Sequence, residues 1–336
     1  MRIRRAGAAS LLVALGLTAC GDEVVGPGEG ETFEIVFDGL ARIPAAQGTF
    51  TVWVHDGVDT VAVGTLAPGT DAEDVGPFTF TLPLAGARGV FLSVEPAADP
   101  SPGPSASVVL KGAFDGRSAT LVGEGALTDG RPLQTDPGAH SLFTTSNNSQ
   151  GYPSAENAGL WLFTLTPSRN VHGTREVKVT PLEPGWTYEG WLVWQGTPKV
   201  WISYGKFRPD ETSLLTSRDD TGTGPFAGPE DFRNAGVEDV PGEEWTTDVV
   251  ARELGIELPG GFDLPLEVDA VDDAGDALWH HVISIEPAFD LVEGPVAGAP
   301  FVVRPYENAI GAGGPGVPRT ILLARPLPNG IVRPVG

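Results

Sequence analysis

The chain has 336 residues, and 44 acidic residues against 21 Lys and Arg give it a formal net charge of −23 at pH 7. Such a surface repels phosphate backbones and anionic lipid headgroups, so we expect no binding to nucleic acid. The length is enough for about two domains, and 45 Gly and 31 Pro favour the many short segments of an all-β chain.

The first twenty residues have the layout of an export signal. Arg2, Arg4 and Arg5 precede an uncharged run over 6–18 that is too short to span a bilayer comfortably. The run ends in Leu-Thr-Ala-Cys at Cys20, which resembles the bacterial lipobox, whose cysteine is diacylated and becomes the new N-terminus. Cys20 is the only cysteine, so it has no partner for an intramolecular disulfide. We predict a lipoprotein signal peptide over 1–19 and lipidation of Cys20; the alternative is a secretory signal with a chance cysteine.

The segment after the signal is predicted to be a tether. Residues 20–31 are rich in Gly and acidic residues and show no periodicity. Two acyl chains anchor a protein stably, so we expect the acylated Cys20 to bind the membrane. No later apolar run approaches 18 residues, and no other segment is expected to span. The expected location is the cell envelope outside the cytoplasm, with the outer membrane or cell surface favoured because Gly21 follows the cysteine.

A first β-sandwich module is predicted over 32–123. Phe33, Ile35 and Phe37 alternate with their neighbours, and Asp56-Gly57 separates two β-rich runs, which is typical of a hairpin. Further expected strands cover Thr60–Leu66, Phe78–Leu84, Val90–Glu95, Ser107–Lys111 and Ala119–Val122. This spacing suits an immunoglobulin-like sandwich.

A second module is predicted over 155–330, after a connector over 124–154 that has little pattern. Its expected strands are Gly159–Leu165, Arg175–Val179, Trp186–Trp194, Lys199–Phe207, Leu264–Asp269, Leu278–Glu286, Phe301–Arg304 and Thr320–Ala324. A long insertion over 208–260 interrupts it, and Thr247 precedes what we predict to be a short capped helix ending at Gly255. A loop of that length in a compact domain is either functional or poorly ordered.

The two modules repeat one pattern. Val90–Pro96 (VFLSVEP) matches His281–Pro287 (HVISIEP), and Phe50–Gly57 followed by Gly64 resembles Tyr188–Gly196 followed by Gly205. Proline has no N–H to donate, so each Glu-Pro pair is expected to close a strand. We therefore predict two tandem immunoglobulin-like β-sandwich modules of an all-β chain.

These landmarks resemble the extracytoplasmic C-terminal domain of anti-sigma-K-type factors. The resemblance is carried by Trp186–Pro198 (WTYEGWLVWQGTP), Gly159–Leu162 (GLWL), Pro225–Phe232 (PFAGPEDF), Val109–Thr120 and the two Glu-Pro closures. It implies a sensor or binding domain without catalytic residues. The cytoplasmic helical domain and the transmembrane helix of a true anti-sigma factor are not found in this sequence. A lipobox protein lies beyond the membrane, so direct sigma-factor binding is not expected.

The sequence offers no catalytic motif. Five histidines are present without an H-E-x-x-H pattern, and the adjacent His280 and His281 should point to opposite faces of one strand. Gly311–Gly316 fits G-x-G-x-x-G literally, but Pro315 and the lack of a following helical pattern deny it a dinucleotide-binding context. Glu95 and Glu286 occur once per module, which favours a shared structural role over a paired-carboxylate site. We therefore expect a protein that is not an enzyme.

One acidic cluster is a candidate metal site. Asp219, Asp220, Glu230 and Asp231 lie in the insertion, and calcium takes six to eight oxygen ligands. No EF-hand spacing appears, and 44 acidic residues produce such clusters by chance. The expected cofactor is none, and the alternative function is a calcium-binding adhesin or cation-dependent hydrolase that uses this cluster.

Four tryptophans lie between Trp186 and Trp201, where they fill a core or form a surface for an envelope protein or glycan. We expect Trp191 and Trp201 to point inward and Trp194, on the opposite face of its strand, to point outward as a candidate partner surface. The predicted function is therefore a lipid-anchored, non-enzymatic binding, scaffold or sensor-like protein of the envelope.

Overall fold

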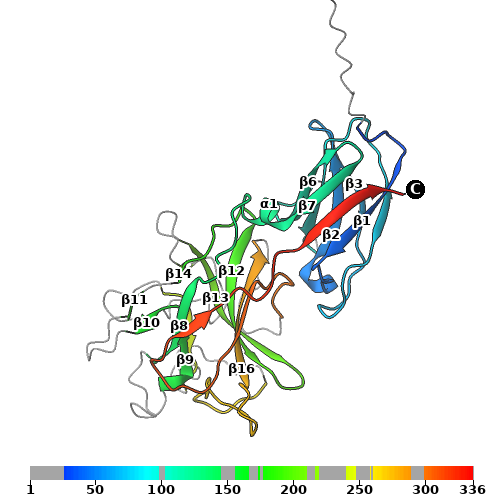
Figure 1. Ribbon diagram of the computed structural model, residues 1–336. Helices are drawn as coiled ribbons and strands as arrows, with labels where there is room; N and C mark the ends of the chain where they lie inside the picture. Colours follow the sequence, from blue (N-terminus) through cyan, green and yellow to red (C-terminus); the bar gives the residue numbers. More distant parts are fainter. Residues whose placement is uncertain are drawn as a thin grey trace, which may run out of the picture.

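The computed structural model describes residues 26–97, 103–144, 156–165, 173–174, 177–209, 216–218, 240–246, 258, 260–288 and 299–335. Figure 1 shows two lobes built from antiparallel strands. Within the described residues the only α-helix is the short α1 (Gly123–Leu127), and single 3-10 turns lie at Ala45–Gln47 and Glu156–Ala158. The predicted all-β class is confirmed. No helix of the described part is long and apolar enough to cross a membrane.

The first unit is one continuous sheet of eight strands. Its members are β1 (Thr32–Asp38), β2 (Thr49–His55), β3 (Thr60–Thr65), β4 (Phe78–Thr81), β5 (Gly89–Glu95), β6 (Val108–Asp115), β7 (Ser118–Val122) and β19 (Asn329–Pro334). They are ordered β3-β2-β5-β6-β7-β19-β1-β4. The two edge strands approach each other, because a Cβ on Gly64 of β3 would lie 2.7 Å from Cζ of Phe78 of β4. The sheet therefore curls around its apolar face.

The second unit contains two larger sheets and one isolated strand pair. Its members are β8 (Gly138–Leu142), β9 (Gly159–Trp161), β12 (Trp186–Trp194), β13 (Val200–Pro209), β14 (Thr216–Arg218), β15 (Gly242–Glu244), β16 (Trp279–Pro287), β17 (Tyr306–Ala309) and β18 (Arg319–Ile321). One sheet has the order β14-β13-β12-β16-β17 and the other β15-β9-β8-β18. A single bridge between Tyr306 and Leu323 joins β17 to the chain just after β18. The separate pair is β10 (Thr164–Leu165) with β11 (Gly173–Thr174).

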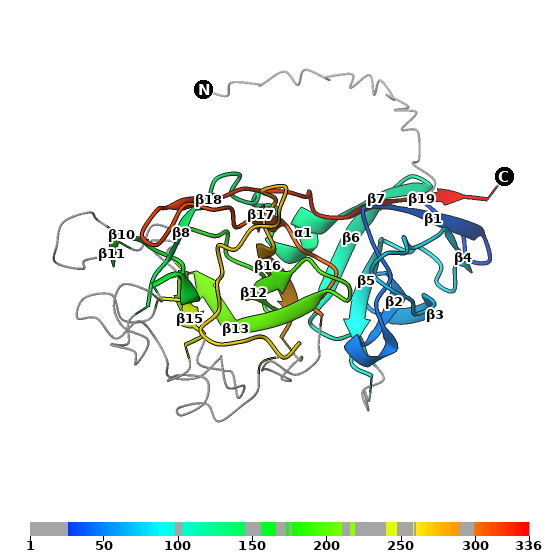
Figure 2. The ribbon, with the colours of Figure 1, turned by 90° about the horizontal axis from the view of Figure 1, so that it is seen from below.

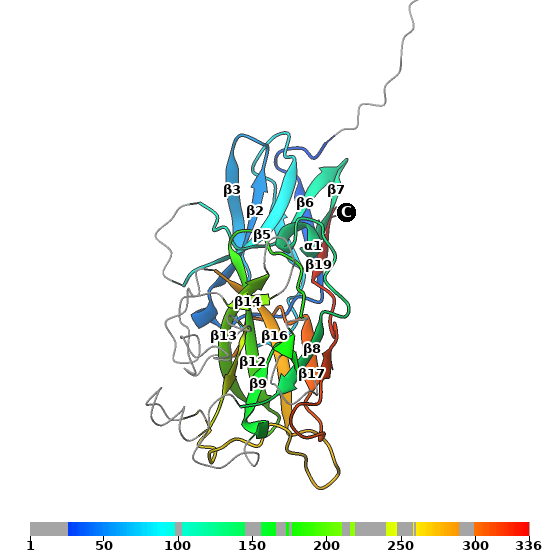
Figure 3. The ribbon, with the colours of Figure 1, turned by 90° about the vertical axis from the view of Figure 1, so that its left-hand side faces the viewer.

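The strand orders of the two units correspond. The first unit reads β3-β2-β5-β6-β7-β19-β1-β4, and the second reads β13-β12-β16-β17-β18-β8-β9-β15, with β14 added at one edge. Figure 3 shows β3, β2 and β5 in one lobe and their counterparts β13, β12 and β16 in the other. Each unit also has a register shift at the same point, between Val52 and Trp53 in β2 and between Gly190 and Trp191 in β12.

The correspondence includes an exchange of strands between the units. β8 follows β7 along the chain but pairs with β18, whereas β19 follows β18 but pairs with β7 and β1. In Figure 2 the red β19 runs beside β7 and β1, far from the rest of the C-terminal region. Each unit is thus completed by a strand that follows the other unit in the sequence: β19 pairs in the first unit, and β8 pairs in the second.

Several boundaries predicted from the sequence were wrong for this reason. The predicted connector over 124–154 contains β8, and the predicted second module, 155–330, ends inside a strand of the first unit. The immunoglobulin-like form is not confirmed, because the first unit is one continuous sheet and an immunoglobulin sandwich has two.

Two expected strands are buried loops. Leu264–Asp269 and Phe301–Arg304 form no strand, but Leu266, Val268 and Phe301 are buried in the core. An apolar run in the sequence indicates that a segment is buried. It does not tell whether the buried segment pairs as a strand or runs as a loop. The helix predicted from Thr247 lies outside the described residues.

The two units share one apolar core. The rings of Phe50 and Phe301 lie 6.1 Å apart across the junction, and Trp186 Nε1 donates a hydrogen bond of 3.1 Å to the carbonyl of Val108. Arg304 also forms an ion pair of 2.7 Å with Asp71. These contacts fix the first unit against the second.

Candidate functional site

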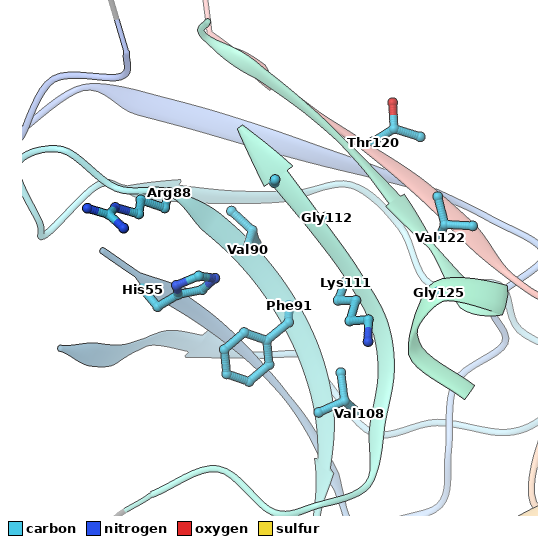
Figure 4. A pocket seen from close by; sticks show the side chains of 11 residues that line it. His55, Arg88, Val90, Phe91, Val108, Lys111, Gly112, Thr120, Val122 and Gly125 are labelled. Atoms are coloured by element: carbon cyan, nitrogen blue, oxygen red, sulfur yellow. The ribbon is translucent and has the colours of Figure 1, made fainter. Parts of the chain in front are cut away.

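A groove of about 700 Å³ lies on the outer face of the first unit, over β2, β5, β6 and β7. Figure 4 shows its side chains. The apolar part is formed by Phe91, Val108, Ala113 and Val122, and Val90 borders it with a side chain that is buried in the core. The remaining lining residues are His55, Arg88, Lys111, Gly112, Thr120 and Gly125.

Strand pairing places the central groove residues in one row. Trp53 stands opposite Phe91 across β2 and β5, Phe91 opposite Lys111, and Lys111 opposite Val122. Directly opposed residues project from the same face of a sheet, so these four side chains are neighbours. The Phe91 ring is stacked on Trp53, with centroids 6.3 Å apart and planes 11° apart, and this holds it in place at the floor of the groove.

The groove is hollow because small residues surround this row. Gly112 and Ala113 follow Lys111 on β6, and Gly125 of α1 faces the Lys111 stem, since a Cβ on Gly125 would lie 3.9 Å from Cε. At the far end Gly89 leaves room for the imidazole of His55. A Cβ on Gly89 would lie 2.5 Å from His55 Nε2.

The charges of the groove have the opposite sign to those of the chain. The ionisable lining residues are His55, Arg88 and Lys111, and no carboxylate lines the groove. Within the described residues, neither Arg88 nor Lys111 forms an ion pair within 4.0 Å. Asp56 lies nearby, but hydrogen bonds of 2.8 Å from the backbone of Asp59 and Val58 occupy its Oδ1. These bonds, with a smaller effect of Arg88, lower the pKa of Asp56.

The lining of the groove suits the binding of a ligand and offers few groups for catalysis. The lining combines an aromatic ring face and aliphatic side chains with two permanent cations, and Thr120 supplies the only hydroxyl. No lining residue is a carboxylate or a thiol. The groove fits the pattern of an apolar site with a few polar groups that orient a ligand.

The tryptophan predicted as a partner surface lies elsewhere, and its predicted orientation was wrong. The indole of Trp194 is half-buried against the main core, with centroids 5.1 Å from Trp279 and 5.3 Å from Phe262. Trp191 and Trp201 lie on the other face of the sheet in a small cluster of their own. The opposite orientation of Trp191 and Trp194 was correct, but the main core lies on the Trp194 side.

The remaining predicted site residues are not described by the structure. Cys20, Asp219, Asp220, Glu230 and Asp231 lie outside the described residues, so lipidation and calcium binding stay predictions. Among the residues that are described, no group of three or more His, Cys, Asp or Glu side chains could hold a metal ion.

Sequence reasoning missed a buried polar chain in the second unit. The hydroxyl of Tyr204 lies 2.8 Å from His281 Nε2, and His281 Nδ1 lies 3.2 Å from His140 Nδ1. Burial lowers the pKa of His281 to about 3. Burial, followed by the charges of His281 and Arg319, lowers the pKa of His140. Burial also raises the pKa of Tyr204, with a smaller effect of Glu189. All three side chains are therefore neutral at pH 7.

His280 points away from this chain, as its predicted orientation requires. Its Nδ1 lies 3.5 Å from a carboxylate oxygen of Glu307 on the outer face, whereas His281 is buried. A polar turn lies just before β16, where Asp272 Oδ1 accepts the backbone N–H groups of Ala274 and Asp276.

Comparison of the chain with protein-family models, curated proteins and solved structures gives no match.

Proposed function

We propose that this chain is a lipid-anchored, extracytoplasmic binding protein that is not an enzyme and that holds its ligand in the groove of the first unit. The carrying observation is the groove itself, an apolar hollow with cationic residues in a strongly acidic chain. The predicted signal peptide and the lipidation of Cys20 would place this groove in the cell envelope. The proposal includes no direct contact with a sigma factor.

We further propose that the two units are copies of one module. The matching strand orders support this, as do the register shifts beside Trp53 and Trp191. If so, the copies have diverged at the groove. The residue opposite Phe91 is Lys111, whereas the residue opposite the corresponding Val282 is Glu307, which pairs with Arg325 at 3.0 Å. Ligand binding is therefore assigned to the first copy alone.

The test compares small molecules that co-purify with the lipoprotein from cell envelopes. We expect a compound that is bound to the wild type and lost from the double variant Phe91→Ala/Lys111→Glu. Lys199→Glu is the matched control, because it makes the same charge change at an exposed lysine of the second unit. An identical set of compounds in all three preparations would contradict the proposal.

The anchor needs its own measurement. Labelling with a radioactive fatty acid should mark the wild type and not Cys20→Ser, and a protease added to intact cells or to cells with a permeabilised outer membrane should reach the labelled protein. Labelling of Cys20→Ser would overturn the assigned site.

The alternative, a calcium-binding adhesin or cation-dependent hydrolase, depends on residues outside the described part. A rise of the melting temperature with added calcium, reversed by a chelator and absent from Asp219→Asn/Asp220→Asn, would favour it, because a ligand that binds only the folded state stabilises it.

A further inference from the structure

We propose that the ligand of the groove is a long-chain carboxylate, that is, the anion of a fatty acid. This inference rests on the proposed binding function of the same groove and adds the chemical class of the ligand. Lys111 would meet the carboxylate, and the alkyl chain would lie over Phe91 along the apolar lining.

The volume and the lining suit an alkyl chain. About 700 Å³ lies within the usual range of small-molecule sites, and Phe91, Val108, Ala113 and Val122 supply apolar surface around it. Each methylene removed from water contributes about 0.8 kcal/mol, which corresponds to roughly fourfold in affinity per fully buried carbon. Binding should therefore strengthen with chain length until the groove is full.

The charge of the groove selects an anion. Lys111 stands in the central row between Phe91 and Val122, whereas Arg88 lies at the end of the groove beside His55 (Figure 4). No lining carboxylate competes for either cation. A net charge of −23 on the chain repels anions in general, so an anion that binds must gain from local cations and apolar contact together.

Other occupants fit the lining less well. A peptide brings backbone amides that need hydrogen-bond partners, and β5 is already paired on both sides, with β2 and with β6. A glycan needs many donors and acceptors, but Thr120 is the only hydroxyl here. The net charge opposes docking on an anionic bilayer. An alkyl chain needs no hydrogen bonds.

The test is a calorimetric titration of the full chain carrying Cys20→Ser. This substitution removes the predicted lipidation site, so the protein can be handled without detergent, which would compete for the groove. The probes are laurate, the dodecyltrimethylammonium cation and acetate, each below its micellar concentration. We expect laurate to bind one to one, at least tenfold more tightly than the cation of equal chain length, and acetate to give no measurable binding. Octanoate should bind more weakly than laurate.

Variants locate the site. Lys111→Glu should weaken the binding of laurate at least tenfold and remove the preference for the anion. Phe91→Ala should weaken the binding of laurate and of the cation by the same factor. Lys199→Glu should bind laurate as the wild type does. Unchanged melting temperatures of the three variants would show that each is folded.

The outcomes separate the two proposals. Equal affinity for laurate and the cation would overturn the proposed ligand class. So would a laurate affinity that neither groove substitution changes. If laurate fails to bind while the compound that co-purifies from envelopes still depends on Phe91 and Lys111, the ligand class is wrong and the binding function stands. If neither depends on the groove, both proposals fail.

Discussion

Trp53 and Trp191 make the same hydrogen bond in the two units. The indole Nε1 of Trp53 donates to Ser93 Oγ at 2.8 Å, and that of Trp191 donates to Ser284 Oγ at 2.9 Å. Both tryptophans are buried, each beside the register shift of its strand. The two pairs join equivalent strands, β2 to β5 and β12 to β16, so the repeat seen in the sequence extends to individual polar contacts.

Each serine hydroxyl in turn donates a hydrogen bond to a glutamate two residues later. Ser93 donates to Glu95 and Ser284 to Glu286. Glu95 also accepts the N–H of Ser105, and Glu286 accepts the N–H of Phe301 at 2.8 Å. Each carboxylate thus ties the end of its strand to the chain that follows, which agrees with the structural role expected for the two glutamates.

Replacement of either serine should destabilise the protein by a similar amount. Ser93→Ala or Ser284→Ala removes the acceptor of a buried indole N–H and the donor to a buried carboxylate, and a buried polar group without a partner costs about 1–3 kcal/mol. Urea unfolding of the two variants measures the loss. Ser118→Ala, at an exposed serine, is the control and should change the free energy of unfolding by about 0.5 kcal/mol or less. A loss of that small size in the buried variants would contradict the hydrogen-bond chain.

The sequence predicted the positions of strands and the repeat better than it predicted which strands pair and which strand faces meet the core. Trp186–Trp194 is a strand with the expected bounds, because its β-branched and aromatic residues favour one. Burial along that strand is continuous up to Trp194, so both faces are covered and alternation does not tell which covers the main core. This is why the orientation predicted for Trp194 failed.

The groove and the strand exchange could not be predicted for a related reason. β8 and β19 are short and weakly patterned, and their partners lie far away in the chain. The groove depends on Phe91, Lys111 and Val122 becoming cross-strand neighbours, which only the pairing of β5, β6 and β7 decides. Lys111 as a rare lysine in an acidic chain was the one signal present in the sequence.

Removal of the last strand should unfold the first unit, although that strand follows the second unit in the sequence. A chain ending at Pro326 lacks β19, leaves β1 and β7 with unpaired edges, and removes the buried Val332. We expect rapid proteolysis within residues 32–122 and partial rescue by a synthetic peptide of residues 327–336. Deletion of Gly336 alone is the control. Resistance of the truncated chain to proteolysis would show that β19 is dispensable.

The buried histidines should make the stability of the second unit depend on pH. Above pH 6.5 both are neutral in the folded and unfolded chain. Below pH 6.5 the unfolded chain binds protons that the folded chain does not, down to about pH 3 for His281, so stability falls as pH falls, by up to about 1.4 kcal/mol per pH unit for each histidine that stays neutral in the folded chain. His140→Leu should flatten this dependence.

Urea unfolding at several pH values between 7 and 4 measures the slope. Leu142→Ala is the matched control, because it removes buried surface from the same strand without removing a titrating group. It should lower stability at every pH and leave the slope unchanged. Equal slopes for His140→Leu and the wild type would exclude His140 as a source of the acid sensitivity.

Gly190 should be intolerant of a side chain because of Tyr204. A Cβ at this position would overlap the Tyr204 ring, and Tyr204 is held by its contact of 2.8 Å with His281. The corresponding pair in the first unit is Val52 with Val63, which shows that the fold accepts a side chain there when the neighbour is smaller. Gly190→Ala should therefore cost about 1–3 kcal/mol, the usual cost of overpacking.

A double-mutant cycle with Tyr204→Val tests whether the ring is the cause. Tyr204→Val removes the ring and its contact with His281, so it should be destabilising by itself. Gly190→Ala should then cost at least about 1 kcal/mol less in the Tyr204→Val background than in the wild type, a coupling expected of side chains in contact. Strictly additive losses would mean that Gly190 is required for its backbone and not for the room it leaves to Tyr204.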